Sequence, residues 1–156
     1  MLLLAMAAAS VDPCDANPQT SATISSCAKA AAAASRPVNG SCDKYVQTVE
    51  VSNCAWQLYK ENDRAMNAQY RSAIARFTVV DEGLRQSHYN GTLSREYLKA
   101  AQIAWLKYRD NTCEGLALIS FGGTITSSNH AFCLADVTKK RTEELRKLTS
   151  FPESPH

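Results

Sequence analysis

The chain has 156 residues, enough for one domain with a short appendage. Apolar residues make up 45% and charged residues 21%, which is the balance of a globular domain and excludes an intrinsically disordered chain. Seventeen Lys and Arg residues against fifteen Asp and Glu residues leave a net charge of +2, which excludes a strongly basic nucleic-acid-binding protein.

The first ten residues form a short apolar run that ends in small residues. This pattern is typical of the second half of a secretory signal peptide with its small-residue cleavage site, although no basic segment precedes it. No apolar run in the chain approaches the roughly 20 residues that a membrane-spanning helix needs. We therefore expect residues 1–10 to be a signal-peptide remnant and the protein to be secreted or periplasmic, without a membrane span.

Residues 11–41 are rich in Ala, Ser, Pro and Asn, and we interpret them as an appendage before the main domain. Residues 28–34 have high helix propensity but no large apolar face, so a short helix there would add little core. The sequence Asn-Gly-Ser at residues 39–41 predicts a turn. A faint repeat links the appendage to the main domain, because Cys14 and Cys42 begin two similar segments that each end at a second cysteine.

From Thr48 to about Glu82 the pattern is helical, because apolar residues recur at the spacing of one helix face. The residues of this face are Tyr59, Met66, Tyr70, Ala73 and Phe77, widened by Trp56 and Ile74. Thr48 or Ser52 can cap the start of the helix, and Gly83 is its expected end. A loop is expected over residues 85–91, with Asn-Gly as its turn signal.

A second helix is expected from Ser94, its predicted N-cap, to about Cys113. Its buried face is predicted to comprise Leu98, Ala101, Trp105 and Tyr108, broadened by Tyr97, Ala104 and Leu106. Residues 115–131 are predicted to be a loop around two glycines, with Leu118, Ile119 and Phe121 tucked against the helices. A third helix is expected over about residues 131–149, with Leu134, Val137, Leu145 and Leu148 facing inward.

Three amphipathic helices without an alternating strand pattern predict an all-α fold. The cysteines are even in number and form no C-x-x-C pair, and the three histidines are not clustered. We therefore expect no metal and no cofactor, but three disulfides formed in an oxidising compartment. The predicted architecture is a small disulfide-stapled bundle of about three main helices, with an antiparallel helical hairpin, over residues 42–150.

Two blocks of the sequence carry a recognisable motif. The longer block is the run Ala101-Gln102-x-x-Trp105-Leu106-x-Tyr108-Arg109-Asp110-x-x-Cys113, followed by Gly122-Gly123-Thr124 and by Cys133, Asp136, Thr138, Arg141 and Leu145. The shorter block, upstream, comprises Cys42, Thr48, Cys54, Ala55, Tyr59, Asp63, Asn67 and Tyr70. Together these blocks, over about residues 42–148, resemble the LprI family of lysozyme inhibitors. The resemblance implies a small, exported, disulfide-bonded helical domain whose partner is lysozyme.

The motif residues have physical roles that can be predicted. Trp105 is on the expected buried face, so we expect it to pack in the core. Gln102 is expected to hydrogen-bond across to a neighbouring helix. Arg109, near the expected C-terminal end of the second helix, is expected to bind carbonyl groups or a carboxylate such as Asp63. The glycines at 122–123 are expected to supply positive φ angles in a turn.

The pairing of the cysteines stays open at this point, because six cysteines allow 15 connectivities. We favour Cys113–Cys133, which would close the 115–131 loop, and Cys42–Cys54, which would tie the segment before the first helix to it. Cys14–Cys27 then follows by elimination and by the repeat. The rival arrangement joins Cys54 to Cys113 and Cys42 to Cys133, because antiparallel helices would place the first two close together.

The sequence lacks the motifs of common enzymes, and oxidised cysteines cannot serve as nucleophiles, so we expect no catalytic residues. The candidate binding surface is the 115–131 loop, whose neutral hydrogen-bonding residues are Ser120, Thr124, Ser127, Ser128, Asn129 and His130. Such groups suit the lysozyme cleft, which holds two catalytic carboxylates. The alternative function is a structural or interaction module of the cell envelope that does not bind lysozyme.

Overall fold

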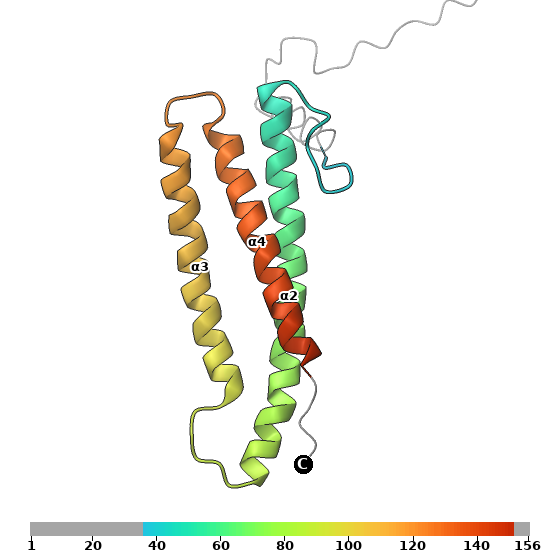
Figure 1. Cartoon of the computed structure of the whole chain (residues 1–156), viewed down its shortest axis with the longest axis vertical. Helices are drawn as coiled ribbons and strands as arrows, with labels where there is room; N and C mark the ends of the chain where they lie inside the picture. The colour runs from blue at the N-terminus through green and yellow to red at the C-terminus, as the bar shows by residue number, and fades with distance from the viewer. Residues whose placement is uncertain (1–35, 152–156) are drawn as a thin grey trace, which may run out of the picture.

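A computed structural model describes residues 36–151, and it confirms the all-α prediction. Three long helices follow one another: α2 (Thr48–Gln86), α3 (Ser94–Ile119) and α4 (Thr126–Ser150). Figure 1 shows that each helix runs antiparallel to the one before it, so that α2 and α4 are parallel. Within residues 36–151, no helix is both long and apolar enough to cross a membrane.

The core lies between the lower halves of the three helices, in the view of Figure 1. Its buried cluster comprises Met66 and Ala73 from α2, Leu98 from α3 and Leu145 from α4. Half-buried side chains surround this cluster, namely Tyr70, Ile74, Phe77, Trp105 and Leu148. The predicted inward faces of the first and third helices are thus confirmed. Each fully buried large aliphatic side chain contributes about 1.5–3 kcal/mol to the free energy of unfolding.

The end of α2 lies beyond the expected Gly83, so that prediction is wrong. His88, rather than a glycine, adopts the left-handed conformation with a φ of 59°. The amide of His88 donates to the carbonyl of Arg85 at 3.0 Å, and the amide of Tyr89 donates to the carbonyl of Leu84 at 3.0 Å. These two bonds, together with the positive φ of the residue just past the helix end, form the Schellman motif that terminates α2. The connection to α3 therefore covers residues 87–93 instead of 85–91.

The start of α3 is capped by another helix and not by its own first residues. Leu93 is the N-cap residue and makes no side-chain cap, so the prediction that Ser94 caps the helix is wrong. The carboxylate of Asp81, on α2, instead accepts hydrogen bonds from the backbone amides of Ser94 at 2.7 Å and Arg95 at 3.2 Å. Asp81 is completely buried, and its charge also favours the positive end of the α3 dipole.

The connection between α3 and α4 is much shorter than predicted. The expected loop over residues 115–131 is wrong, because α3 continues to Ile119 and α4 already begins at Thr126. Gly115 lies inside α3, where a single glycine weakens a helix without ending it. The turn itself, residues 120–125, contains Gly122 with a φ of 78°, which confirms one of the two predicted positive-φ glycines.

The buried face of α3 also differs from the prediction. Tyr97 and Tyr108 are 64% and 60% exposed, and Ala101 and Ala104 are exposed as well. The buried positions are Leu98, Gln102, Arg109, Cys113 and Ala117. α3 is rotated about its axis relative to the predicted orientation, because its polar motif residues turn inward to bond with α2 and α4. Hydrophobic periodicity cannot predict this rotation.

Two of the three favoured disulfides are confirmed. Cys42 bonds to Cys54 with a Cα–Cα distance of 5.9 Å, and Cys113 bonds to Cys133 with a Cα–Cα distance of 5.5 Å. The rival pairing is wrong, because Cys113 and Cys133 lie about equally far from the α3–α4 turn and so meet across the hairpin. The predicted Cys14–Cys27 pair lies outside the described residues, as do the signal-peptide remnant and the helix expected at residues 28–34.

Candidate functional site

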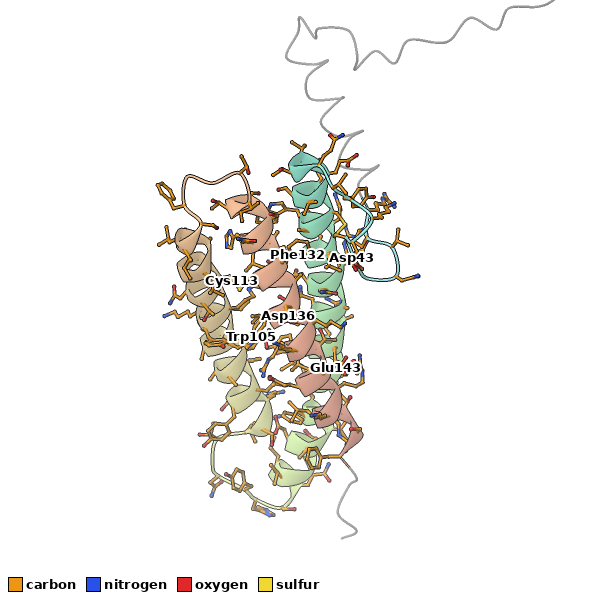
Figure 2. All side chains as sticks on the ribbon, turned by 45° about the horizontal axis from the view of Figure 1, so that its top comes forward. Asp43, Trp105, Cys113, Phe132, Asp136 and Glu143 are labelled. Carbon is orange, nitrogen blue, oxygen red and sulfur yellow. A yellow bond between two sulfur atoms is a disulfide. The ribbon has the colours of Figure 1, made fainter. Side chains whose placement is uncertain are left out.

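Trp105 lies at the centre of the motif, on α3 facing α4 (Figure 2). The guanidinium carbons of Arg109 and Arg141 lie 5.2 Å and 5.8 Å from the centroid of its ring. The side chain also packs against the core cluster, although it stays half-buried. The predicted packing role of Trp105 is therefore confirmed, and two cations add attraction to its ring faces.

Gln102 makes the predicted hydrogen bond to a neighbouring helix, and it bonds to both α2 and α4. Its amide nitrogen donates to the sulfur of Met66 on α2, with a separation of 3.2 Å. Its amide oxygen accepts from Nε of Arg141 on α4, at 3.1 Å. Gln102 is 6% exposed, so both of its polar atoms are satisfied inside the protein.

Arg109 forms the predicted ion pair with Asp63, at 3.5 Å, and a closer pair with its neighbour Asp110, at 2.7 Å. It lies in the middle of α3 and not near its end, so the helix dipole does not explain its position. Within residues 36–151, Nη1 of Arg109 has no hydrogen-bond partner although it is buried. Burial raises the pKa of the adjacent Tyr59 phenol, while the Arg109 charge acts in the opposite direction.

The predicted binding residues lie around the end of the α3–α4 hairpin, here called the tip and defined as residues 116–130 (Figure 1). Only the turn residues among them are in a loop, because Ser127, Ser128, Asn129 and His130 belong to the first turns of α4. Thr124 and Asn129 are exposed, whereas Ser128 is buried. The predicted residues are thus close together, but they do not form one flexible loop.

Most of the predicted donors at the tip are already used inside the protein. The Ser127 hydroxyl shares a 2.9 Å hydrogen bond with Ser52 and accepts one from the Trp56 indole at 3.1 Å. The Ser128 hydroxyl donates to the carbonyl of Ile125 at 2.9 Å. Ser120 accepts from the Asn129 amide at 3.2 Å. These bonds hold the tip in one shape and leave few hydroxyl groups free for a partner.

His130 is half-buried and contacts two other elements. Its ring lies edge-on to Trp56 of α2, with 5.8 Å between the centroids. Its Nε2 lies 3.7 Å from a carboxylate oxygen of Glu114 on α3. We expected His130 to face the carboxylates of the lysozyme cleft, but in this structure the carboxylate beside it belongs to Glu114 of the same chain.

The tip exposes several large apolar side chains, which the sequence analysis did not predict. Ile119 and Phe121 are 82% and 81% exposed, and Leu118 and Ile125 are 58% and 52% exposed. The prediction that Leu118, Ile119 and Phe121 tuck against the helices is therefore wrong. The cause is the length of α3, which carries these side chains past the last core residues.

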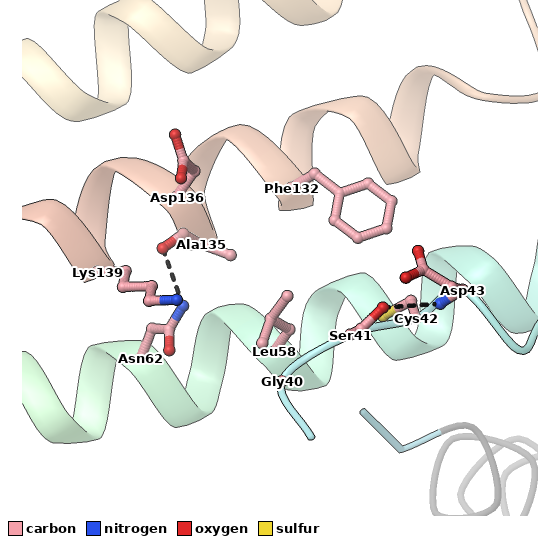
Figure 3. A pocket seen from close by; sticks show the side chains of 10 residues that line it. All are labelled: Gly40, Ser41, Cys42, Asp43, Leu58, Asn62, Phe132, Ala135, Asp136 and Lys139. Carbon is pink, nitrogen blue, oxygen red and sulfur yellow. Dashed lines mark hydrogen bonds between the residues drawn. The ribbon is translucent and has the colours of Figure 1, made fainter. Parts of the chain in front are cut away.

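Two hollows lie on the sides of the bundle. One, of about 580 Å³, lies between α2 and α3 and is lined by the motif residues Tyr59, Asp63, Asn67, Tyr70, Gln102 and Arg109, together with other residues of both helices. The other, of about 540 Å³, lies where the segment before α2 meets α2 and α4. Figure 3 shows Phe132 above the second hollow, and the Asn62 amide donating to the carbonyl of Ala135 at 2.9 Å.

Comparison with known proteins identifies a family whose matched region contains the motif residues described above. The family model described as Lysozyme inhibitor LprI matches residues 40–145, which include both disulfides and the Gln102–Trp105–Arg109 cluster. The chain belongs to the LprI family. A relative named uncharacterised protein R02472, from Rhizobium meliloti (strain 1021), is 36% identical over 130 residues, which cover 82% of this chain and 91% of that protein. No solved structure matches this LprI-family chain.

The LprI motif therefore contains two kinds of residue in this chain. Cys113, Cys133 and Trp105 join α3 to the rest of the bundle, and Cys42 ties the segment before α2 to Cys54. Tyr59, Asp63 and Asn67 line the open hollow between α2 and α3, and Gln102 belongs to both groups. The sequence placed Tyr59 on the inward face of the first helix, but it did not indicate that an open hollow would lie between α2 and α3. Among the described residues, no group of three or more His, Cys, Asp or Glu side chains could hold a metal ion.

Proposed function

We propose that this protein is an exported inhibitor of lysozyme and that it contacts lysozyme with the tip. Membership of the LprI family carries the first part of the proposal, because the family is described by that activity. The two disulfides support export, since such bonds persist in oxidising compartments. An inhibitor of this kind blocks access of substrate and performs no chemistry of its own.

The shape of the tip supports its role as the contact surface. Lysozyme binds a sugar chain in a cleft where one catalytic carboxylic acid sits in a hydrophobic pocket. Ile119 and Phe121 project from the end of the hairpin and are almost fully exposed. Residues 116–129 contain no charged side chain, so inserting them into a narrow cleft would not strand a charge away from water. Thr124 and Asn129 remain as exposed polar groups for hydrogen bonds.

The tip is also held rigidly before it meets a partner. The Cys113–Cys133 disulfide fixes the base of the hairpin. The Thr126 hydroxyl donates to the carbonyl groups of Ser120 and Gly123, which closes the turn. Because little conformational freedom remains to be lost, the entropy cost of binding is reduced. The net charge of +2 gives no long-range attraction to a basic lysozyme, so affinity would depend on this local fit.

A lysis assay tests both parts of the proposal. Lysozyme is added to a suspension of bacterial cells and turbidity is followed with and without the purified protein. The double substitution Ile119→Ser/Phe121→Ser should weaken inhibition at least about tenfold, equivalent to roughly 1.4 kcal/mol of binding free energy. Because both side chains are exposed, the melting temperature should not fall.

The matched control is Val79→Ser/Tyr89→Ser, which removes exposed apolar side chains at the opposite end of the bundle. It should inhibit like the wild type. Full inhibition by the folded tip variant would exclude the tip and direct attention to the hollow between α2 and α3. Absence of inhibition by the wild-type protein, against lysozymes of several types, would refute the proposal and favour the envelope-module alternative.

A further inference from the structure

The outer face of α3 carries an uncharged stripe that runs along most of the helix. The stripe comprises Tyr97, Ala101, Ala104, Tyr108, Asn111, Gly115 and Leu118. These positions alternate by four and three residues, which is the heptad spacing of a coiled-coil seam. All seven residues are exposed, including Tyr97, Tyr108 and Leu118 at 64%, 60% and 58%. An α-helix on the surface of a bundle ordinarily presents charged residues on its outer side.

Gly115 gives an independent indication that another backbone approaches this stripe. It lies inside α3, where glycine is a poor helix former. A Cβ atom at this position would meet nothing within 4 Å, so the fold of the single chain does not require a glycine there. A glycine in a helix interior with open space around it is explained if a second helix packs closely against it.

The charges beside the stripe decide which helix could pack there. Lys107 and Glu114 are both exposed and occupy equivalent flanking positions, one heptad apart. If two copies of α3 pack antiparallel, Lys107 lies beside the partner's Glu114, and the two-fold axis repeats the same pair. In a parallel pair, Lys107 would lie beside the partner's Thr112, and Glu114 beside the partner's Ile119. Only the antiparallel arrangement matches opposite charges.

We propose that two copies of this protein form an antiparallel two-fold dimer through the Ala101–Leu118 part of the α3 stripe. In this register Ala101 packs against the partner's Leu118, Ala104 against the partner's Gly115, and Tyr108 against the partner's Asn111. The small residues Ala104 and Gly115 thus oppose one another on either side of the central Tyr108–Asn111 layers, which lets the helices approach closely. The Tyr108 hydroxyl and the Asn111 amide supply polar groups that can bond to each other at the centre of the seam.

The dimer adds an interface that the single chain lacks and uses no residue of the core. Glu114 also lies 3.7 Å from His130 of its own chain, but its carboxylate is 66% exposed and can face a second cation. The hollow between α2 and α3 is lined by Lys99 and Ile103, which lie on a different side of α3 from the stripe. The dimer is therefore independent of that hollow, and its test does not depend on lysozyme.

Sedimentation equilibrium of the oxidised full-length exported chain tests the proposal. The wild-type protein should show twice the mass of one chain at high concentration and dissociate on dilution. Lys107→Glu and Glu114→Lys should each weaken the dimer roughly tenfold or more, because each change turns two attractive pairs into two repulsive ones. The double reversal Lys107→Glu/Glu114→Lys should restore the wild-type dimer. Lys99→Glu is the matched control, because it makes the same charge change on α3 away from the stripe.

Gly115→Gln separates the interface from the stability of the chain. A glutamine should stabilise α3 in the monomer, where it meets open space, and so raise the melting temperature in dilute solution. The same substitution should weaken the dimer, because its side chain blocks the closest contact with the partner's Ala104. A wild-type protein that stays monomeric up to roughly 1 mM, or a dimer insensitive to Lys107→Glu or not restored by the double reversal, would overturn the proposal.

Lysozyme inhibition is read in a separate assay, so each proposal can fail alone. A monomeric protein that inhibits lysozyme would overturn the dimer only. A dimer with the predicted charge dependence that does not inhibit would overturn the proposed function only.

Discussion

Removal of the Asp81 carboxylate should destabilise the bundle, because this carboxylate caps the start of α3. Asp81 is fully buried and accepts hydrogen bonds from the amides of Ser94 and Arg95. It also lies 3.6 Å from the guanidinium of Arg95. The substitution Asp81→Ala leaves both amides without an acceptor at the start of α3.

The magnitude follows from the groups left unpaired. Loss of a helix N-cap costs about 0.5–2 kcal/mol, and a buried donor without a partner costs about 1–3 kcal/mol. Since the two amides are only partly buried, we expect a total loss of about 2–4 kcal/mol in the free energy of unfolding. For a domain of this size, that loss corresponds to a fall of about 10 °C in melting temperature.

Thermal and urea unfolding, followed by circular dichroism, measure this effect. Asp81→Asn should fall between the wild type and Asp81→Ala, because its amide oxygen can still accept one hydrogen bond. The control is the adjacent Glu82→Ala, whose exposed ion pair with Arg85, at 3.9 Å, contributes at most about 1 kcal/mol. Equal stability of the Asp81→Ala and Glu82→Ala proteins would refute the role assigned to Asp81 as the cap of α3.

Three further predictions concern the core, the cysteines and the half-buried phenol of Tyr59. Trp105→Ala should cost about 2–3 kcal/mol in urea unfolding, less than truncation of a fully buried aromatic residue, because Trp105 is half-buried; an unchanged midpoint would contradict its packing role. Ellman titration of the denatured, unreduced protein should find almost no free thiol, and three or more would contradict the disulfide framework. Burial raises the pKa of Tyr59 in the folded state, so stability should be fully retained below pH 10.0 and decline as pH rises through the folded-state pKa. Tyr59→Phe should lessen that alkaline loss, and an identical loss in this variant would contradict the assignment.

The motif residues show what sequence spacing can and cannot predict. The link of Gln102 to another helix, the pairing of Arg109 with Asp63 and the bond between Cys113 and Cys133 were all predictable. These interactions depend on the side-chain chemistry of a few residues and on hairpin topology. The roles of Asp81 and His88 were not predictable, because a capping acceptor can come from a distant helix and a non-glycine residue can adopt positive φ.

The sequence by itself determined that the chain forms three amphipathic helices and which faces of α2 and α4 turn inward, whereas the choice between the two cysteine pairings needed the structure. Local periodicity and turn chemistry carry that information. Only the tertiary structure decided the rotation and length of α3. Packing turned Gln102 and Arg109 inward and left Tyr97 and Tyr108 in solvent. The same packing extended α3 through Gly115 and carried Ile119 and Phe121 beyond the core, so a predicted polar loop became a rigid apolar tip.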